Sequence, residues 1–135
     1  MAAAAHAGWR GALEGIVEAA VVAMTAKGAR RERIVAAVGP CIAQPSYEVG
    51  LEFLERFAAA EPGAERFFAP GKTSDKRQFD LPGFVLHRLA QSGVGKAEWI
   101  GRDTCEEEAL FFSNRRAVLR GERDYGRLLS AIALA

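Results

Sequence analysis

The stretch Ile34-Val35-Ala36-Ala37-Val38-Gly39-Pro40 decides the fold class of this chain. Five apolar residues that end at a Gly-Pro pair are too few for a helix, so they predict a short strand. Because no polar residue interrupts the run, we expect this strand to be buried on both faces of its sheet. The segments on either side decide whether helices accompany it.

Helical and strand patterns alternate around this stretch. Residues 13–24 repeat apolar side chains at helical spacing, and residues 46–59 and 81–92 do the same, with Glu52 placed to pair with Arg56 one turn later. The shorter patterns predict strands in the alanine run before His6 and over 97–101 and 128–134. Residues 69–80 are polar and predict a surface loop. A helix is predicted from the capping box Thr104-Cys105-Glu106-Glu107 to about Leu119. This order predicts an α/β domain with a mixed sheet and flanking helices, and residues 1–135 as a single domain.

Composition narrows the possible partners and compartment. The chain has 135 residues, 50% of them hydrophobic, and a formal net charge of +1 from 18 basic and 17 acidic residues. This balance predicts no general attraction to nucleic acid or to acidic membranes. No apolar run reaches the roughly 20 residues that span a bilayer. Two cysteines cannot form a dense disulfide framework, so we expect a cytoplasmic protein.

His6 and Cys41 are the first candidates for chemistry. His6 lies at a predicted strand-to-helix junction, where α/β proteins place ligands, and Gly8 would let backbone approach one closely. A histidine that only satisfies the turn is an equally good interpretation. Cys41 follows a predicted strand and could be a nucleophile activated by His6, although a small buried residue is the commoner fate of a free cysteine. Cys105 is interpreted as structural.

Arginines form the second group of candidates. Arg115 and Arg116 come late in a predicted helix, where cations complement the helix dipole. Guanidinium groups also bind phosphate or carboxylate in a bidentate manner, so the pair could form an anion clamp, joined by Arg10 or Arg127. Neither a nucleotide-binding P-loop nor a self-contained zinc motif of ordinary spacing occurs in the sequence.

Separated motifs together resemble one known family. They are, in order, His6-Ala7-Gly8-Trp9-Arg10-Gly11, Gly39-Pro40-Cys41-Ile42, Tyr47-Glu48-Val49-Gly50, Thr104-Cys105 with Phe111-Phe112-Ser113-Asn114-Arg115-Arg116, and Asp124-Tyr125-Gly126-Arg127. This set is similar to the YfiH-like, or laccase-domain, family, and it extends over nearly the whole chain. The match corresponds to the C-terminal portion of the family domain. The opening Met1-Ala2-Ala3-Ala4-Ala5 has no turn or cap before it, so we expect a missing upstream segment.

The resemblance implies an α/β sandwich enzyme of purine metabolism. It implies phosphorolysis of adenosine, inosine, guanosine and methylthioadenosine, and deamination of adenosine, with purine nucleoside and phosphate as the partners. It also implies one metal ion, usually zinc, with His6 as one ligand and two further ligands in upstream motifs; copper is the weaker alternative. Arg10 is the first choice for an anion contact, followed by Arg116 and Arg115.

Three other functions compete with this one. The first is a thiol-dependent hydrolase that uses Cys41 and His6 without a metal. The second is an inactive fragment that folds only as a homo-oligomer or with the missing N-terminal segment. The third, polyphenol oxidation, ranks lowest, because two histidines and two cysteines cannot supply a multicopper centre.

Overall fold

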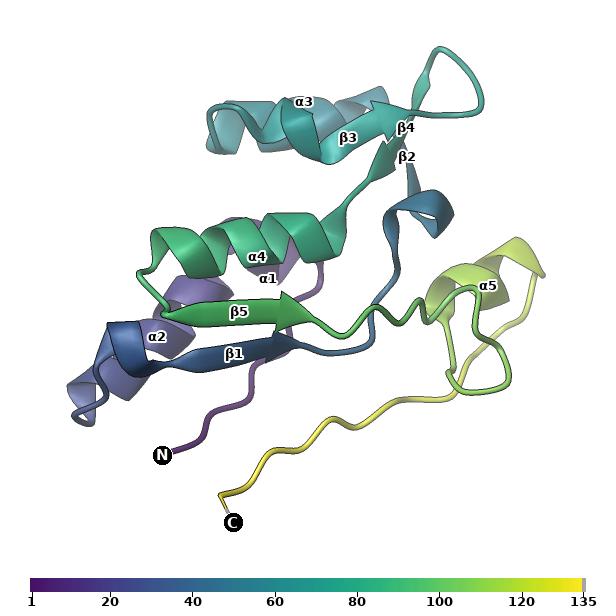
Figure 1. Cartoon of the computed structure of the whole chain (residues 1–135). Coiled ribbons are helices and arrows are strands. Elements are labelled where there is room, and N and C mark those ends of the chain that lie inside the picture. The colour runs from purple at the N-terminus through teal and green to yellow at the C-terminus, as the bar shows by residue number, and fades with distance from the viewer. Residues whose placement is uncertain (135) are drawn as a thin grey trace.

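The structure, a computed structural model, describes residues 1–134 and combines helices with two small sheets (Figure 1). One sheet is a parallel pair with the order β1-β5, and the other is antiparallel with the order β2-β4-β3. The predicted α/β class with a mixture of strand directions is therefore confirmed. Short 3-10 turns join the elements at Arg31–Arg33, Gln44–Ser46 and Ala64–Phe67.

The predicted first helix is two helices separated by a glycine. Helix α1 runs over Trp9–Glu14 and α2 over Ile16–Ala26. Gly15 between them has φ 97°, which an L-residue rarely adopts. The alanine run ahead of α1 has no regular secondary structure, so the strand predicted there is not formed.

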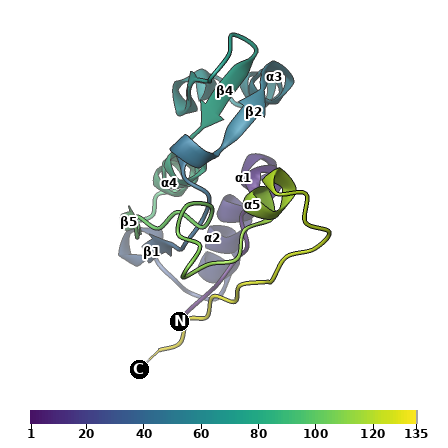
Figure 2. The ribbon, with the colours of Figure 1, turned by 90° about the vertical axis from the view of Figure 1, so that its right-hand side faces the viewer.

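The parallel pair contains the stretch that decided the fold class. Strand β1, Val35–Val38, pairs with β5, Lys96–Trp99, and helix α4, Leu81–Gln91, packs against both. The prediction of a strand was right, but the prediction of burial on both faces was wrong, because Val35 is 74% exposed. In Figures 1 and 2, α4 and the two N-terminal helices lie on one side of this pair, and no helix of the described residues covers its other face.

The antiparallel sheet lies where the sequence predicted a loop and the start of a helix. Strand β2, Glu48–Gly50, pairs with β4, Lys76–Phe79, and β4 pairs with β3, Phe68–Pro70. Helix α3, Leu51–Ala60, begins only after β2, so the helix predicted over 46–59 starts too early. The loop predicted over 69–80 is mostly a hairpin, because Phe68 and Phe79 at the ends of its strands pack into the core, and this outweighs the polar residues between them.

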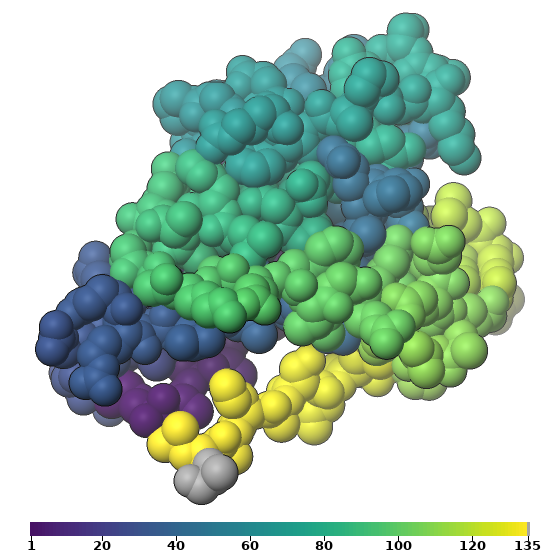
Figure 3. Space-filling view, in the orientation of Figure 1, coloured from purple at the N-terminus to yellow at the C-terminus, as the bar shows by residue number. Residues whose placement is uncertain are grey.

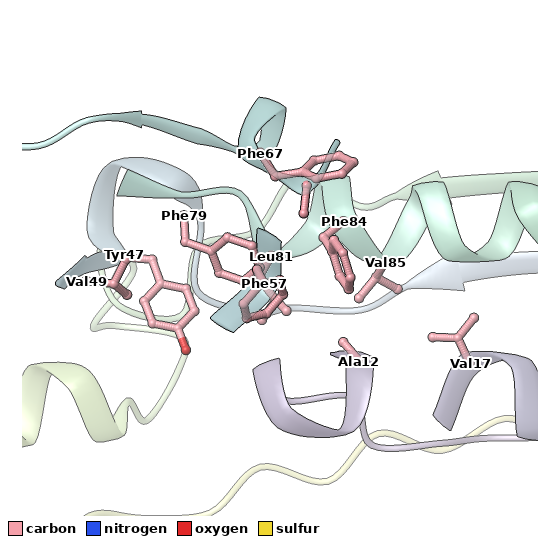
Figure 4. Close-up of a cluster of buried hydrophobic side chains, with 11 residues drawn as sticks. Ala12, Val17, Tyr47, Val49, Phe57, Phe67, Phe79, Leu81, Phe84 and Val85 are labelled. Atoms are coloured by element: carbon pink, nitrogen blue, oxygen red, sulfur yellow. The ribbon is translucent and has the colours of Figure 1, made fainter. Parts of the chain in front are cut away.

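Aromatic rings fill the core between these layers (Figure 4). Phe57 of α3, Phe79 of β4 and Phe84 of α4 are fully buried. The ring centroids of Phe57 and Phe79 are 4.7 Å apart, and those of Phe57 and Phe84 are 5.1 Å apart. Edge and tilted contacts of this kind stabilise a core beyond simple area burial. They fix α3 and α4 against the antiparallel sheet.

The C-terminal third has much less regular structure than the sequence predicted. Helix α5 covers only Asn114–Leu119, and its N-cap is Ser113, which accepts a hydrogen bond from the backbone N–H of Arg116. The helix predicted from Thr104 to about Leu119 forms only in its last part, because residues 104–110 fold into successive turns, with the backbone N–H of Glu107 donating to Asp103 and that of Leu110 to Glu107. Residues 122–134 carry no helix or strand and lie along the lower edge of the molecule (Figure 3).

The strand predicted over 128–134 is therefore not formed. Within the described residues, no backbone–backbone hydrogen bond reaches this segment, and a strand needs such a ladder. None of the helices described is both long and apolar enough to cross a membrane.

Candidate functional site

The first turn of α1 brings several predicted site residues together. Its N-cap, Gly8, has extended backbone and no side chain to cap the helix. The Nε2 atom of His6 lies 3.5 Å from where a Cβ at Gly8 would be, so the imidazole lies beside the start of α1. The His6 side chain, which precedes α1, is exposed, and so is that of Arg10 in the first turn of α1. His6 and Arg10 are thus both exposed to solvent near the start of α1.

Trp9 packs α1 against α3, and two guanidinium groups lie close to its ring. Its ring centroid is 5.0 Å from that of Phe53 on α3. The guanidinium carbon of Arg10 lies 5.3 Å from the Trp9 ring centre, and that of Arg56 on α3 lies 5.4 Å from it. Sequence reasoning missed Arg56, because it expected that side chain to pair with Glu52, and the structure shows no such pair among the ion pairs of the described residues.

Cys41 is half-buried just after β1, where its backbone bridges to Asp103. Burial, together with the carboxylates of Asp103 and Asp80, raises the pKa of the Cys41 thiol to about 12. A thiol with this pKa is almost entirely protonated at neutral pH, whereas the thiolate is the nucleophile. In the described part of the chain, no hydrogen bond joins Cys41 to His6.

An acidic cleft of about 530 Å³ opens beside Cys41, at the carboxyl ends of β1 and β5. Asp103 is buried there and accepts hydrogen bonds from the Ser46 hydroxyl at 2.6 Å and from the Cys105 backbone N–H at 2.8 Å. The cleft is lined by Ala43, Gln44, Pro45, Asp80, Trp99, Gly101, Asp103, Glu106 and Glu107. Its carboxylates disfavour phosphate, and the predicted arginines are not part of its lining.

Arg115 and Arg116 are both engaged with the protein itself. The Arg116 guanidinium donates to the carbonyls of Thr104 at 3.0 Å, Cys105 at 2.9 Å and Phe111 at 2.6 Å. Arg115 donates to the carbonyl of Glu48 at 2.8 Å and lies 5.2 Å from the ring centre of Tyr47. Arg116 has few donors left for a substrate, whereas Arg115 is only partly occupied. Their predicted role as a clamp stays a prediction.

The described residues do not by themselves fit a metal ion. Nowhere in residues 1–134 do three His, Cys, Asp or Glu side chains gather in a way that could hold one. His6 is a single donor, whereas zinc sites in proteins use three or four protein ligands. The imidazole is free to ligate, but this part of the chain does not complete a site around it.

Comparison with known proteins then places the chain. The family model described as "Multi-copper polyphenol oxidoreductase laccase" matches residues 1–135. The chain belongs to this family. Solved structures agree with the laccase-domain assignment: a Neisseria meningitidis protein is 32% identical with a TM-score of 0.73, over 83% of this chain and 45% of that one. A Bacillus licheniformis protein named YfiH is 27% identical with a TM-score of 0.76, over 90% and 46%. The predicted family is thereby confirmed.

Curated laccase-domain relatives carry the names of enzymes. A purine nucleoside phosphorylase of Rickettsia conorii is 36% identical over 131 residues, which is 97% of this chain and 54% of the relative. A protein named adenosine deaminase, from an unknown prokaryotic organism, is 34% identical over 125 residues, or 91% and 48%. The chain spans about half the length of the curated relatives it matches.

Proposed function

We propose that this chain is part of an enzyme that cleaves purine nucleosides with phosphate and also deaminates adenosine. The names of the relatives support phosphorolysis first and deamination second. The observation that supports the proposal is that His6 and Arg10 are exposed on either side of the half-buried Trp9 at the start of α1, within the motif that resembles the family. Purine nucleoside and phosphate are the proposed substrates, and we propose a cytoplasmic location.

Phosphorolysis sets out what the residues at the start of α1 would have to bind. A phosphate oxygen forms a bond to the sugar carbon while the bond from that carbon to the base nitrogen breaks, and the base leaves with the bonding electrons and takes up a proton. A phosphate dianion must therefore be held close to the nucleoside without being repelled. Arg10 supplies positive charge and two parallel N–H donors for this purpose. His6, whose imidazole lies beside Gly8 just before α1, is assigned to the same binding surface.

We further propose that residues 1–135 are the C-terminal portion of a laccase-domain protein. The chain spans only 54% of the Rickettsia conorii relative, which supports a portion of a longer protein, and the C-terminal placement rests on the resemblance of its motifs. A zinc site with His6 as one ligand would then need its other donors from outside these residues.

The decisive assay supplies the chain with inosine and phosphate, and separately with adenosine, with zinc added. The expected products are hypoxanthine with ribose 1-phosphate, and inosine with ammonia. An Arg10→Gln variant should lose phosphorolysis, whereas Arg30→Gln, which removes an exposed ion pair with Glu32, should not. The absence of both hypoxanthine and inosine would contradict the proposal for this chain.

A further inference from the structure

We propose that Arg56 on α3 acts with Arg10 on α1 as a two-arginine site for the phosphate co-substrate, arranged around Trp9. The inference rests on the proposed function, since it names the residue that completes phosphate binding. Arg56 lies outside the motifs that resemble the family. Its role is suggested by where α3 places it.

The geometry brings two distant parts of the chain to one ring. Arg10 and Arg56 are 5.3 Å and 5.4 Å from the centre of the same indole, so their guanidinium carbons lie within about twice that distance of each other. The aromatic core fixes this arrangement, because Trp9 packs against Phe53 and Phe57, which flank Arg56 on α3. Both arginines are exposed, so their flexible ends can close on a small ligand.

Both guanidinium groups lack a carboxylate. Among residues 1–134, neither Arg10 nor Arg56 makes an ion pair or a side-chain hydrogen bond, whereas other arginines do, among them Arg30, Arg88, Arg102, Arg120 and Arg127. Glu52, the expected partner of Arg56, instead folds its carboxylate back toward Gly50 at the start of α3. An oxyanion between the two guanidinium groups would be attracted by both of them.

The two guanidinium groups favour a small tetrahedral oxyanion as the ligand. A guanidinium group can donate two parallel hydrogen bonds, and two such groups suit the several oxygens of a phosphate. The acidic cleft beside Cys41 is the opposite environment, because the four carboxylates in its lining disfavour phosphate.

Trp9 gives a direct test of binding, without any catalysis. The chain has two tryptophans, so a Trp99→Phe variant leaves Trp9 as the only indole reporter. Titration with inorganic phosphate should change Trp9 fluorescence along a saturable curve. In that background, Arg56→Gln should weaken phosphate binding roughly 10-fold or more, as expected for a lost charge-assisted pair of hydrogen bonds. Arg56→Lys should recover part of the affinity.

A matched control is available at Arg66. This exposed arginine lies 4.6 Å from the centre of the Phe67 ring, so Arg66→Gln removes a similar cation–π contact elsewhere. It should leave the phosphate curve unchanged. A ribose 1-phosphate titration and an inosine titration distinguish a phosphate site from a nucleoside site: the first should compete with inorganic phosphate, and the second should not.

Kinetics in the active protein completes the test. Arg56→Gln should raise the KM for phosphate at least 10-fold and change the KM for inosine less than twofold. Equal phosphate binding in Arg56→Gln and the parent, or an equal rise in both KM values, would overturn the inference. If phosphate binds as expected but neither the parent nor any variant performs phosphorolysis, the proposed function is wrong, whereas the anion site is still supported.

Discussion

The aromatic core and the C-terminal segment 122–134 are both rich in large apolar side chains, yet they end in opposite environments. Phe57, Phe79 and Phe84 are fully buried, whereas Leu129 is 93% exposed and Ile132 is 61% exposed. The core residues come from α3, β4 and α4, which face one another. The C-terminal segment has no neighbouring strand within the described residues with which to form a ladder. Burial therefore depends on the partner element as much as on the local hydrophobic pattern.

The strongest test of this comparison is Phe57→Ala. Phe57 contacts rings from four other segments, so its removal leaves a cavity that the rigid surroundings cannot close. We expect the free energy of unfolding to fall by about 3–5 kcal/mol. Urea denaturation followed by circular dichroism measures it. A loss below about 1 kcal/mol would mean that the core is loosely packed, and the contrast with the C-terminal segment would disappear.

The same contrast explains which elements the sequence could predict. The helix over 81–92 was confirmed because its cap, its periodicity and its core face all agree: Asp80 caps α4 by accepting from the Gly83 N–H, and Phe84 points into the core. The strand over 128–134 was predicted wrongly because its pattern contains no information about a partner. The 69–80 hairpin was missed for the converse reason, since strand pairing and the packing of Phe79 and the half-buried Phe68 against the core outweigh its polar residues.

Arg116 connects the less regular part of the chain to α5 and ranks second in expected effect. Its guanidinium accounts for hydrogen bonds to the carbonyls of Thr104, Cys105 and Phe111. Arg116→Met keeps the aliphatic length but leaves those carbonyls without this donor, and should cost about 1.5–3 kcal/mol of stability. The control is Arg115→Met, which loses a single bond to the Glu48 carbonyl and should cost less. Equal losses in the two variants would show that Arg116 does not hold the 104–111 segment.

The candidate site could be predicted only as far as local motifs reach. His6 and Arg10 stand out in the sequence because they lie in one short motif before a helix. Arg56 could not be found this way, because its nearest local partner, Glu52, suggested a helical ion pair, and only the packing of Trp9 on α3 shows where its guanidinium lies. Cys41 was visible in the sequence, but the carboxylates that surround it come from residues far along the chain.

Cys41 gives a pH-dependent prediction of intermediate size. Its pKa is raised from 9.0 to about 12 by burial and by Asp103 and Asp80, so folding favours the protonated thiol. The stability that this contributes is complete below pH 9 and is lost as the pH rises toward 12. At pH 10 the loss should reach about 1 kcal/mol. Comparing urea unfolding of the parent and Cys41→Ala at pH 8 and pH 10 isolates it, since the variant should lack this component.

Thiol chemistry checks the same shift independently. In a Cys105→Ser background, Cys41 is the only thiol. Its alkylation by iodoacetamide should accelerate with each pH unit up to at least pH 10 in the folded chain, but should level off above about pH 9 in urea. Coinciding pH profiles in the two conditions would place the folded pKa near its ordinary value and would restore Cys41 as a candidate nucleophile.

The smallest expected effect belongs to the C-terminal segment itself. Leu129 is almost fully exposed, so Leu129→Ser removes little buried apolar area and should change the free energy of unfolding by less than about 0.5 kcal/mol. The informative comparison is with Phe57→Ala, because both substitutions shorten a large apolar side chain and differ chiefly in its surroundings. A loss above 1 kcal/mol at Leu129 in dilute solution, independent of protein concentration, would mean that residues 128–134 pack against the body of the chain. A loss that grows with protein concentration would instead indicate that the segment is buried between copies, since only association depends on concentration.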